Sequence, residues 1–268
     1  MKKLLVFAAL VFLPGLARAQ YYLDLDALTS PSTTNTSSPG WNIDTVPANT
    51  GGANSPASAS QATGVSSPCS GAPSGTSMSM SVTTSATSTQ TNALFWLWLT
   101  GNDSATTFVS NRWICVTNIG AANNIEMDSA QYNLTLGREF MFGWQCNLGG
   151  YWQIDNLAHG WENTTVACSW PTGWNNVITV GHRTPGDTSC GGVACNNYDK
   201  LILNGATYSI NMTLPSETLL YSTSALIDQF QIDISATSGT AQTVSYNVDD
   251  VNFNAYIPAP PAHSAGMF

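Results

Sequence analysis

Basic residues are scarce in this sequence. Lysine and arginine number 7 among 268 residues, and Lys2, Lys3 and Arg18 lie near the N-terminus. The rest of the chain has four basic residues against sixteen acidic ones, a net charge of −12. Such a chain lacks the basic patches that bind nucleic acid or anionic membranes, and its charge disfavours polyanionic glycans. A neutral partner fits this composition.

Motifs of metal, phosphate and serine-hydrolase chemistry are also missing. No Cys-x-x-Cys pair occurs and the 3 histidines are scattered, which argues against a zinc site. There is no phosphate-binding loop and no Gly-x-Ser-x-Gly elbow. Asp249 and Asp250 are adjacent, and either is a candidate calcium ligand, although no EF-hand spacing accompanies them. We expect no cofactor, with calcium as the open alternative.

No apolar run is long enough to span a bilayer. The run from Leu4 to Leu13 follows two lysines and precedes the small-x-small site Ala17-Arg18-Ala19. This pattern is typical of a secretory signal cleaved after Ala19, with a retained anchor as the alternative. We predict a secreted protein, extracellular or periplasmic, without a membrane span.

The six cysteines all follow this segment, and an even count in an exported chain indicates disulfides. Fifteen pairings are possible. Two glycines between Cys190 and Cys195 allow a tight loop, so this bridge is the easiest to propose. If it forms, the pairs we favour among the remaining cysteines are Cys146–Cys168 and Cys69–Cys115, and the connectivity stays open.

The chain divides into four parts by composition. Residues 1–19 form the signal segment, and residues 20–75 form a lead-in rich in Ser, Thr, Pro and Gly that we expect to be partly disordered. The lead-in contains one strand candidate, "WNIDTV" from Trp41. Residues 76–257 form the predicted domain, and residues 258–268 a disordered tail.

The predicted domain consists of short runs rich in aromatic and β-branched residues, separated by turn signals. "SMSMSVTTS" alternates polar and apolar residues, so Met78, Met80 and Val82 should face a core. Asn204-Gly205 between two apolar runs predicts a type I′ hairpin. The fold class is therefore all-β, a two-sheet antiparallel β-sandwich of about ten strands. The continuous apolar run around Trp96 and Trp98 predicts a central strand buried on both faces.

The run "NIEMDSAQY" carries the candidate chemistry. Side chains alternate along a strand, so Glu126 and Asp128 share one face, while Ile125 and Met127 share the core face. Gln131 breaks this parity. It joins the two carboxylates only if a β-bulge inserts a residue near Ser129-Ala130.

A jelly roll with Glu-x-Asp on a strand of its concave face resembles the concanavalin A-like lectin/glucanase superfamily. The resemblance covers residues 75–256 in general pattern, includes "NVDDVNF" near the C-terminus, and is strongest to uncharacterised secreted bacterial members. Retaining endoglucanases of this superfamily carry Glu-x-Asp-x-x-Glu. The resemblance therefore implies that Glu126 is the nucleophile and Asp128 the intervening carboxylate, if the protein is an enzyme. The acid/base residue would fall at Gln131.

A glutamine amide has no proton to donate to a leaving oxygen, but it forms hydrogen bonds with sugar hydroxyls. Five of the nine tryptophans lie between residues 144 and 174, interleaved with polar side chains that suit sugars. We predict a neutral polysaccharide as ligand. The predicted ligand-binding residues are Glu126, Asp128, Gln131, Gln145, Trp152, Asp155 and Trp161.

Three functions stay open at this point. The first is a secreted, lectin-like glycan-binding protein. The second is a glycoside hydrolase or polysaccharide lyase of the same fold, with Glu126 as nucleophile or base. For the lyase, Gln153–Asp155 and Tyr198–Lys200 weakly resemble motifs of alginate lyases, except that the first ends in Asp where those enzymes have His. The third is a structural or adhesive cell-surface protein.

Overall fold

The structure of this protein is a computed structural model that describes residues 19–28, 41–44, 57–63, 68–84, 91–156, 159–186, 188–234 and 240–258. The predicted signal segment up to residue 18, much of the lead-in and the tail from residue 259 lie outside these ranges. No helix within the described ranges has the length and apolar character needed to cross a membrane.

The described residues form two antiparallel sheets of eight strands, A and B, with three short 3-10 helices: η1 (Leu25–Ala27), η2 (Ile119–Ala121) and η3 (Thr188–Cys190). Sheet A contains, in spatial order, β13 (Ala206–Pro215), β12 (Cys195–Leu203), β11 (Asn175–Thr184), β6 (Thr107–Thr117), β16 (Thr243–Tyr256), β4 (Thr76–Thr83) and β3 (Ala57–Thr63), with β1 (Gln20–Tyr22) paired to β16. Sheet B contains β10 (Gly160–Ala167), β9 (Tyr151–Asn156), β8 (Arg138–Asn147), β7 (Asn124–Asn133), β15 (Ala225–Ile234), β5 (Thr91–Thr100) and β2 (Asn42–Asp44), with β14 (Glu217–Thr218) paired to β8.

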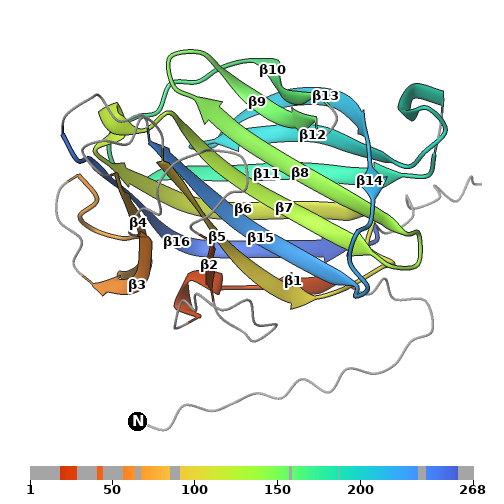
Figure 1. Cartoon of the computed structure of the whole chain (residues 1–268), viewed down its shortest axis with the longest axis horizontal. Helices are drawn as coiled ribbons and strands as arrows, with labels where there is room; N and C mark the ends of the chain where they lie inside the picture. The colour runs from red at the N-terminus through yellow and green to blue at the C-terminus, as the bar shows by residue number, and fades with distance from the viewer. Residues whose placement is uncertain are drawn as a thin grey trace, which may run out of the picture.

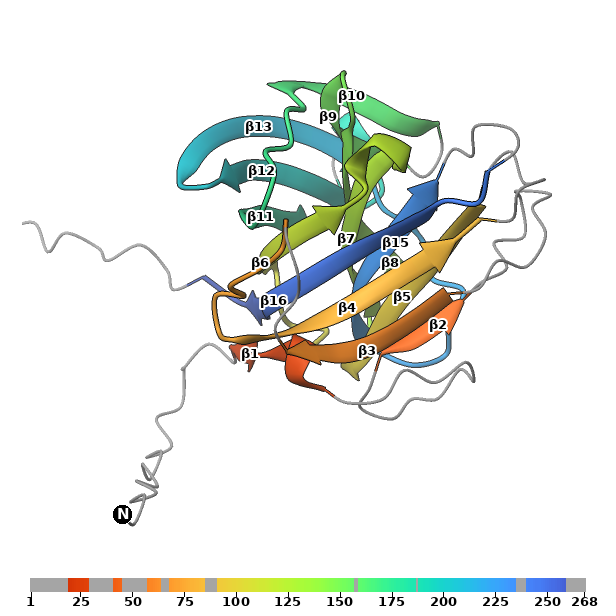
Figure 2. The same ribbon diagram turned by 90° about the vertical axis from the view of Figure 1, so that its left-hand side faces the viewer.

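The two sheets pack face to face, with sheet B in front of sheet A in Figure 1, and Figure 2 shows β16, β4 and β3 of sheet A beside β15, β5 and β2 of sheet B. One continuous apolar core fills the space between them. Alternation along β4 places Met78, Met80 and Val82 in this core, fully buried, as predicted. The fold is the predicted all-β, two-sheet antiparallel sandwich of the jelly-roll type.

Local predictions about turns and disulfides are also confirmed. Asn204 and Gly205 join β12 to β13 with φ values of 47° and 84°, which are the positive angles that a type I′ turn requires. All six cysteines are paired, as Cys69–Cys115, Cys146–Cys168 and Cys190–Cys195. These bridges tie β6 to the segment before β4, β8 to the end of β10, and η3 to β12.

The lead-in contributes strands to both sheets. The predicted strand after Trp41 is β2, which pairs with β5 in sheet B. In addition, β3 pairs with β4 and β1 pairs with β16 in sheet A. The boundary at residue 76 stays a prediction.

The prediction for Trp96 and Trp98 was wrong. Their strand, β5, is next to the edge strand β2 and is not central in its sheet. Phe95, Leu97 and Leu99 face the core, whereas the two tryptophans lie on the outer face and are partly exposed. The continuous apolar run of β5 therefore arises because its outer face carries aromatic side chains, not because both of its faces are buried.

Candidate functional site

The strand β7 pairs without interruption with β8 and β15, from Glu126 to Tyr132. The β-bulge near Ser129-Ala130 that would be needed to bring Gln131 to the two carboxylates is absent, so strict alternation holds. Glu126 and Asp128 share the outer face of sheet B, and Gln131 points to the opposite side. Gln131 is fully buried there and donates hydrogen bonds to the carbonyl oxygens of Asn102 and Ala105, at 2.5 and 3.2 Å. The prediction that Gln131 joins the two carboxylates was wrong.

Trp152 is also on the core side. Its side chain is 1% exposed and its ring lies 6.2 Å from that of Trp170. In contrast, Gln145, Asp155 and Trp161 lie on the outer face with Glu126 and Asp128, because each is in register with an outward residue of the neighbouring strand. Five of the seven predicted ligand-binding residues therefore share one face, and Gln131 and Trp152 do not.

Pairing between neighbouring strands aligns polar side chains in a row across five strands of this face. This polar row runs from β15 to β10 and consists of Gln231, Glu126, Gln145, Gln153 and Asn163. The amides are linked head to tail: Gln145 donates to Gln153 at 2.6 Å, and Gln153 donates to Asn163 at 2.7 Å. Gln231 donates to the Glu126 carboxylate at 3.3 Å. Such a chain holds its side chains in one orientation.

A second row, one pleat further along the strands, has a tryptophan at each end. This tryptophan row contains Trp96, Gln229, Asp128, Gly143, Asp155 and Trp161. At the strand spacing of about 4.8 Å, its two tryptophans stand roughly 24 Å apart. Gln229 donates to Asp128 at 2.7 Å, and the Trp144 backbone N–H donates to the same carboxylate at 3.2 Å.

Gly143 allows two carboxyl groups to approach each other in this row. A Cβ atom at Gly143 would lie 2.6 Å from the Cβ atom of Asp155, so Asp155 leans over the glycine. The same Cβ position is 3.0 Å from Asp128 Oδ1 and 3.5 Å from Asp155 Cγ. These two atoms are therefore at most about 6.5 Å apart, comparable with the ~5–5.5 Å between the carboxyl groups of retaining glycosidases.

The carboxyl groups of this face hold protons unusually tightly. Burial, with the neighbouring Asp128 charge, raises the pKa of Glu126 well above its ordinary value. Burial raises the pKa of Asp128 to about 7, opposed by the hydrogen bond from Gln229, and burial with the Glu217 charge raises the pKa of Asp155 to about 6. In the described part of the chain no lysine or arginine stands on either row. The face therefore lacks a counter-charge.

Beyond the tryptophan row the outer face becomes apolar. Trp98, Ile227, Ala130 and Met141 form the next row, and Tyr132 follows them. Leu219 packs against these residues, and Tyr221 stacks on Tyr132 with ring centroids 4.4 Å apart. We call this set the apolar patch. One face of sheet B thus combines hydrogen-bonding side chains with aromatic surface, the two kinds of group that hold a sugar.

Other residues that could take part in catalysis or metal binding lie away from the polar row and the tryptophan row. His182, on β11 of sheet A, contacts Asp199 through Nδ1 at 2.8 Å. Tyr198 is fully buried between the sheets, where its hydroxyl donates to the carbonyl oxygen of Asp155 at 3.0 Å, so the two motifs that resemble those of alginate lyases touch through the core and not on the outer face. Asp249 accepts hydrogen bonds from the Ser74 N–H and hydroxyl, at 2.8 and 2.5 Å. No group of three or more His, Cys, Asp or Glu side chains among the described residues is arranged to hold a metal ion.

The predicted ligand-binding residues leave out three of the five positions of the polar row and three of the six positions of the tryptophan row. Gln229, Gln231 and Asp233 of β15 stand on the outer face, although they are about a hundred residues from β7 along the chain. The run "LIDQFQIDIS" predicted a strand, but not which strands lie beside it. Gln153 was among the polar side chains interleaved with the tryptophans but was not selected as a ligand-binding residue, and Asn163 was missed, since pairing partners depend on tertiary structure.

No protein-family model and no curated protein matches this chain. Among solved structures it is similar to the cellulose-induced protein Cip1, with 14% identity and a TM-score of 0.41 over 80% of this chain and 90% of that one. It is also similar to the alginate lyase Aly36B, with 10% identity and a TM-score of 0.38 over 69% and 84%. A third similar structure is arcelin-5, a lectin-like defence protein from Phaseolus vulgaris, with 10% identity and a TM-score of 0.39 over 90% and 99%. Likenesses of this size say nothing about the activity of this chain, and membership of the concanavalin A-like superfamily stays a prediction.

Proposed function

We propose that this protein is a secreted, lectin-like member of the concanavalin A-like superfamily that binds a neutral glycan on the outer face of sheet B. The observation that carries the proposal is the pair of adjacent rows. The polar row presents fixed amide and carboxylate groups to sugar hydroxyls, and the tryptophan row presents an aromatic ring at each end. Binding sites typically combine a few such placed polar groups with aromatic surface.

The charge of the face restricts the glycan. Among the described residues no lysine or arginine stands on the two rows with Glu126, Asp128 and Asp155, so a uronate or sulfated polymer would find no cation there to pair with. A neutral hexose or pentose polymer carries no charge to oppose them. Its hydroxyls can donate to the carboxylates and accept from the amides.

The test is titration calorimetry with cello-, xylo-, manno- and galacto-oligosaccharides, after a glycan array selects the tightest. We expect Gln153→Ala and Trp161→Ala each to weaken binding about tenfold or more, the usual effect of removing a central contact. Tyr208→Ala, which removes an exposed tyrosine from β13 of sheet A, is the matched control. If no neutral glycan binds, or if both variants bind like the parent protein, the proposal is wrong.

Glycoside hydrolysis is the second candidate function, and the approach of Asp128 to Asp155 over Gly143 favours it. In this version Asp155 supplies the acid that is missing at position 131, and Glu126 or Asp128 supplies the carboxylate. Release of reducing ends from the bound glycan tests it. Activity that survives in Asp155→Asn would exclude Asp155 as the acid, and activity that survives in Glu126→Gln would exclude Glu126 as the nucleophile.

A further inference from the structure

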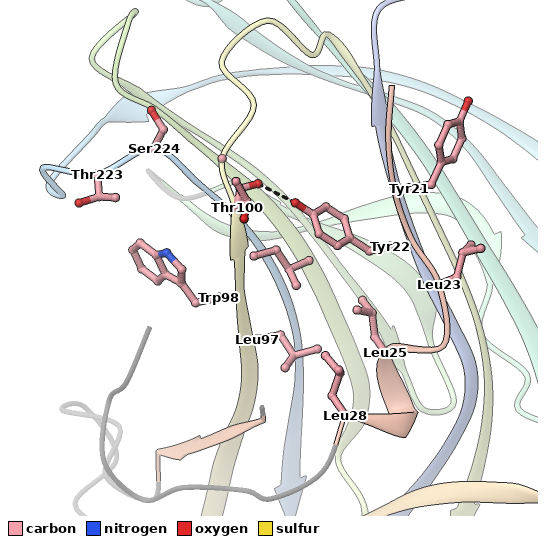
Figure 3. A pocket seen from close by; sticks show the side chains of 12 residues that line it. Tyr21, Tyr22, Leu23, Leu25, Leu28, Leu97, Trp98, Thr100, Thr223 and Ser224 are labelled. Atoms are coloured by element: carbon pink, nitrogen blue, oxygen red, sulfur yellow. Dashed lines mark hydrogen bonds between the residues drawn. The ribbon is translucent and has the colours of Figure 1, made fainter. Parts of the chain in front are cut away.

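A pocket of about 700 Å³ lies at the edge of sheet B, beyond the apolar patch. Figure 3 shows its walls. Residues of the N-terminal segment between Tyr21 and Leu28 form one side, the end of β5 from Leu97 to Gly101 forms the floor, and Thr223 and Ser224 close the third side. This volume lies within the range of about 300–1,000 Å³ that is typical of small-molecule sites.

The described residues that line this pocket are mostly apolar, and none of them has a charged side chain. Leucine, tyrosine and tryptophan make up most of it, and the polar lining groups are hydroxyls and backbone. The Tyr22 hydroxyl is already used, because it donates to the Thr100 carbonyl oxygen at 2.8 Å. Tyr21 and Leu23 remain 66% and 64% exposed. Exposed apolar groups that gather around a hollow are a common mark of a binding site.

The floor of the pocket is a strand edge. β2 pairs with β5 only from Leu94 to Trp96, and in the described ranges no strand continues this pairing from Leu97 to Thr100. The carbonyl oxygens of Trp96 and Thr100 accept hydrogen bonds on this side, from Asn42 and Tyr22. Because every second residue of an antiparallel strand turns its backbone groups the same way, those of Trp98 face this side too. The pocket thus combines the backbone polar groups of one strand edge with apolar side chains around them.

Trp98 connects this pocket to the proposed glycan face. It lines the pocket and also packs against Tyr132 and Tyr221 of the apolar patch, with ring centroids 5.5 and 5.9 Å apart. Two positions earlier on the same strand, Trp96 ends the tryptophan row. A ligand whose sugar lies along the rows would therefore reach the pocket across the apolar patch.

We infer that the pocket receives an uncharged apolar group, alkyl or aryl, that is attached to the glycan bound on the outer face. The ligand class is a glycoside or acylated glycan with an apolar substituent. This inference rests on the proposed function, since the sugar part occupies the rows. A charged substituent is disfavoured, because nothing in the lining would compensate for its desolvation.

The test uses a homologous series of alkyl β-D-glucosides, from methyl to octyl, titrated by calorimetry below their micellar concentrations. Each methylene that enters the pocket should tighten binding about three- to fourfold. Leu23→Asn should flatten this dependence on chain length. Leu220→Asn is the matched control, because Leu220 is 86% exposed and lies outside the pocket lining. Both positions are exposed, so both variants should fold, which circular dichroism checks.

Two results would overturn the inference: affinity that does not depend on chain length, or a dependence that Leu23→Asn and Leu220→Asn change equally. Either can occur while Gln153→Ala and Trp161→Ala still abolish polysaccharide binding, in which case the proposed function stands without the pocket. Conversely, the protein could bind no polysaccharide and still show an affinity for alkyl glucosides that rises with chain length and loses this rise in Leu23→Asn. That result would refute the proposed function and leave only an apolar binding site. The two failures are therefore distinguishable.

Discussion

The strands β7 and β15 carry polar groups on both faces. On the inner face a buried carboxylate has a cationic partner, whereas on the outer face the buried carboxyl groups have none on their rows. On the inner face, Arg112 forms an ion pair with Asp228 at 2.9 Å, both side chains being almost completely buried. Ser129 accepts from the same guanidinium at 3.3 Å, and the Phe230 ring lies 4.9 Å from it. On the outer face, Glu126 and Asp128 are also buried, at 6% and 4% exposure, yet their neighbours are glutamines and other carboxylates.

This difference in charge pairing distinguishes buried polar groups that stabilise the fold from those that could bind a ligand. A buried charge with an opposite partner is compensated within the fold and needs no ligand, although Arg112 Nε and Nη1 and Asp228 Oδ2 have no hydrogen-bond partner among the described residues. Like charges gathered without a partner raise the pKa of each carboxyl and cost stability, and such groups cluster at functional sites. The inner network therefore serves to hold the sheets together, and we assign binding to the outer face.

Removal of the inner anion, Asp228, should have the largest effect on stability. Asp228→Ala leaves the Arg112 guanidinium buried and unpaired, so the free energy of unfolding should fall by about 3–5 kcal/mol. Urea denaturation of the oxidised protein measures this. The double variant Arg112→Met with Asp228→Leu should recover most of the loss, since it buries no charge. A loss below about 1 kcal/mol in Asp228→Ala would show that the pair is not what holds this region.

Two glutamines test the same contrast with matched chemistry. Gln131→Ala removes a donor to the loop carbonyls of Asn102 and Ala105, the second of which also accepts from Arg183, and should cost about 1–3 kcal/mol of unfolding free energy without weakening glycan binding. Gln145→Ala, on the outer face, should weaken glycan binding and cost less stability. Calorimetry and chemical denaturation on both variants give the two readouts. The opposite pattern would reverse the assignment of the faces.

The raised pKa values of the outer carboxyls predict a particular pH dependence. The folded protein holds the protons of Asp155 and Asp128 up to about pH 6 and 7, whereas an unfolded Asp loses its proton near pH 4. The stabilisation is complete below pH 4 and is lost as the pH rises through these values. For Asp128 the fall should be at most about 1.4 kcal/mol per pH unit. The denaturation midpoint should fall as the pH is raised from 4 to 8, and it should fall less steeply in Asp128→Asn than in the parent protein. Equal slopes in the two proteins would contradict this prediction.

The smallest effect is expected at the end of the polar row. Asn163 is exposed and accepts from Gln153, so Asn163→Ala removes the last acceptor of the amide chain. The change in stability should stay within about 0.5 kcal/mol. Glycan affinity should fall less than it does in Gln153→Ala, because Gln145 and Gln153 keep the hydrogen bond between them. Affinity losses of equal size at both positions would show that the row binds as one unit.

Alternation and turn chemistry made much of the fold predictable. The period of two in "SMSMSV" placed Met78 and Met80 in the core, and Asn204-Gly205 specified its hairpin. The same alternation paired Glu126 with Asp128 on one face. It could not decide whether a bulge would carry Gln131 to them, because a bulge depends on the partner strands that hold β7 in register.

The amino-acid sequence was enough to predict that this chain forms strands, that Glu126 and Asp128 share one face of their strand, and that Met78 and Met80 face the core. Tertiary structure alone decided which strands lie beside one another, and therefore that Gln229 and Gln231 complete the rows and that Asp155 meets Asp128 over Gly143. It also decided that Trp96 and Trp161 face outward while Trp152 is buried. The physical reason is that side-chain alternation is a local property of the backbone, whereas strand neighbours are set by how the whole apolar surface is buried.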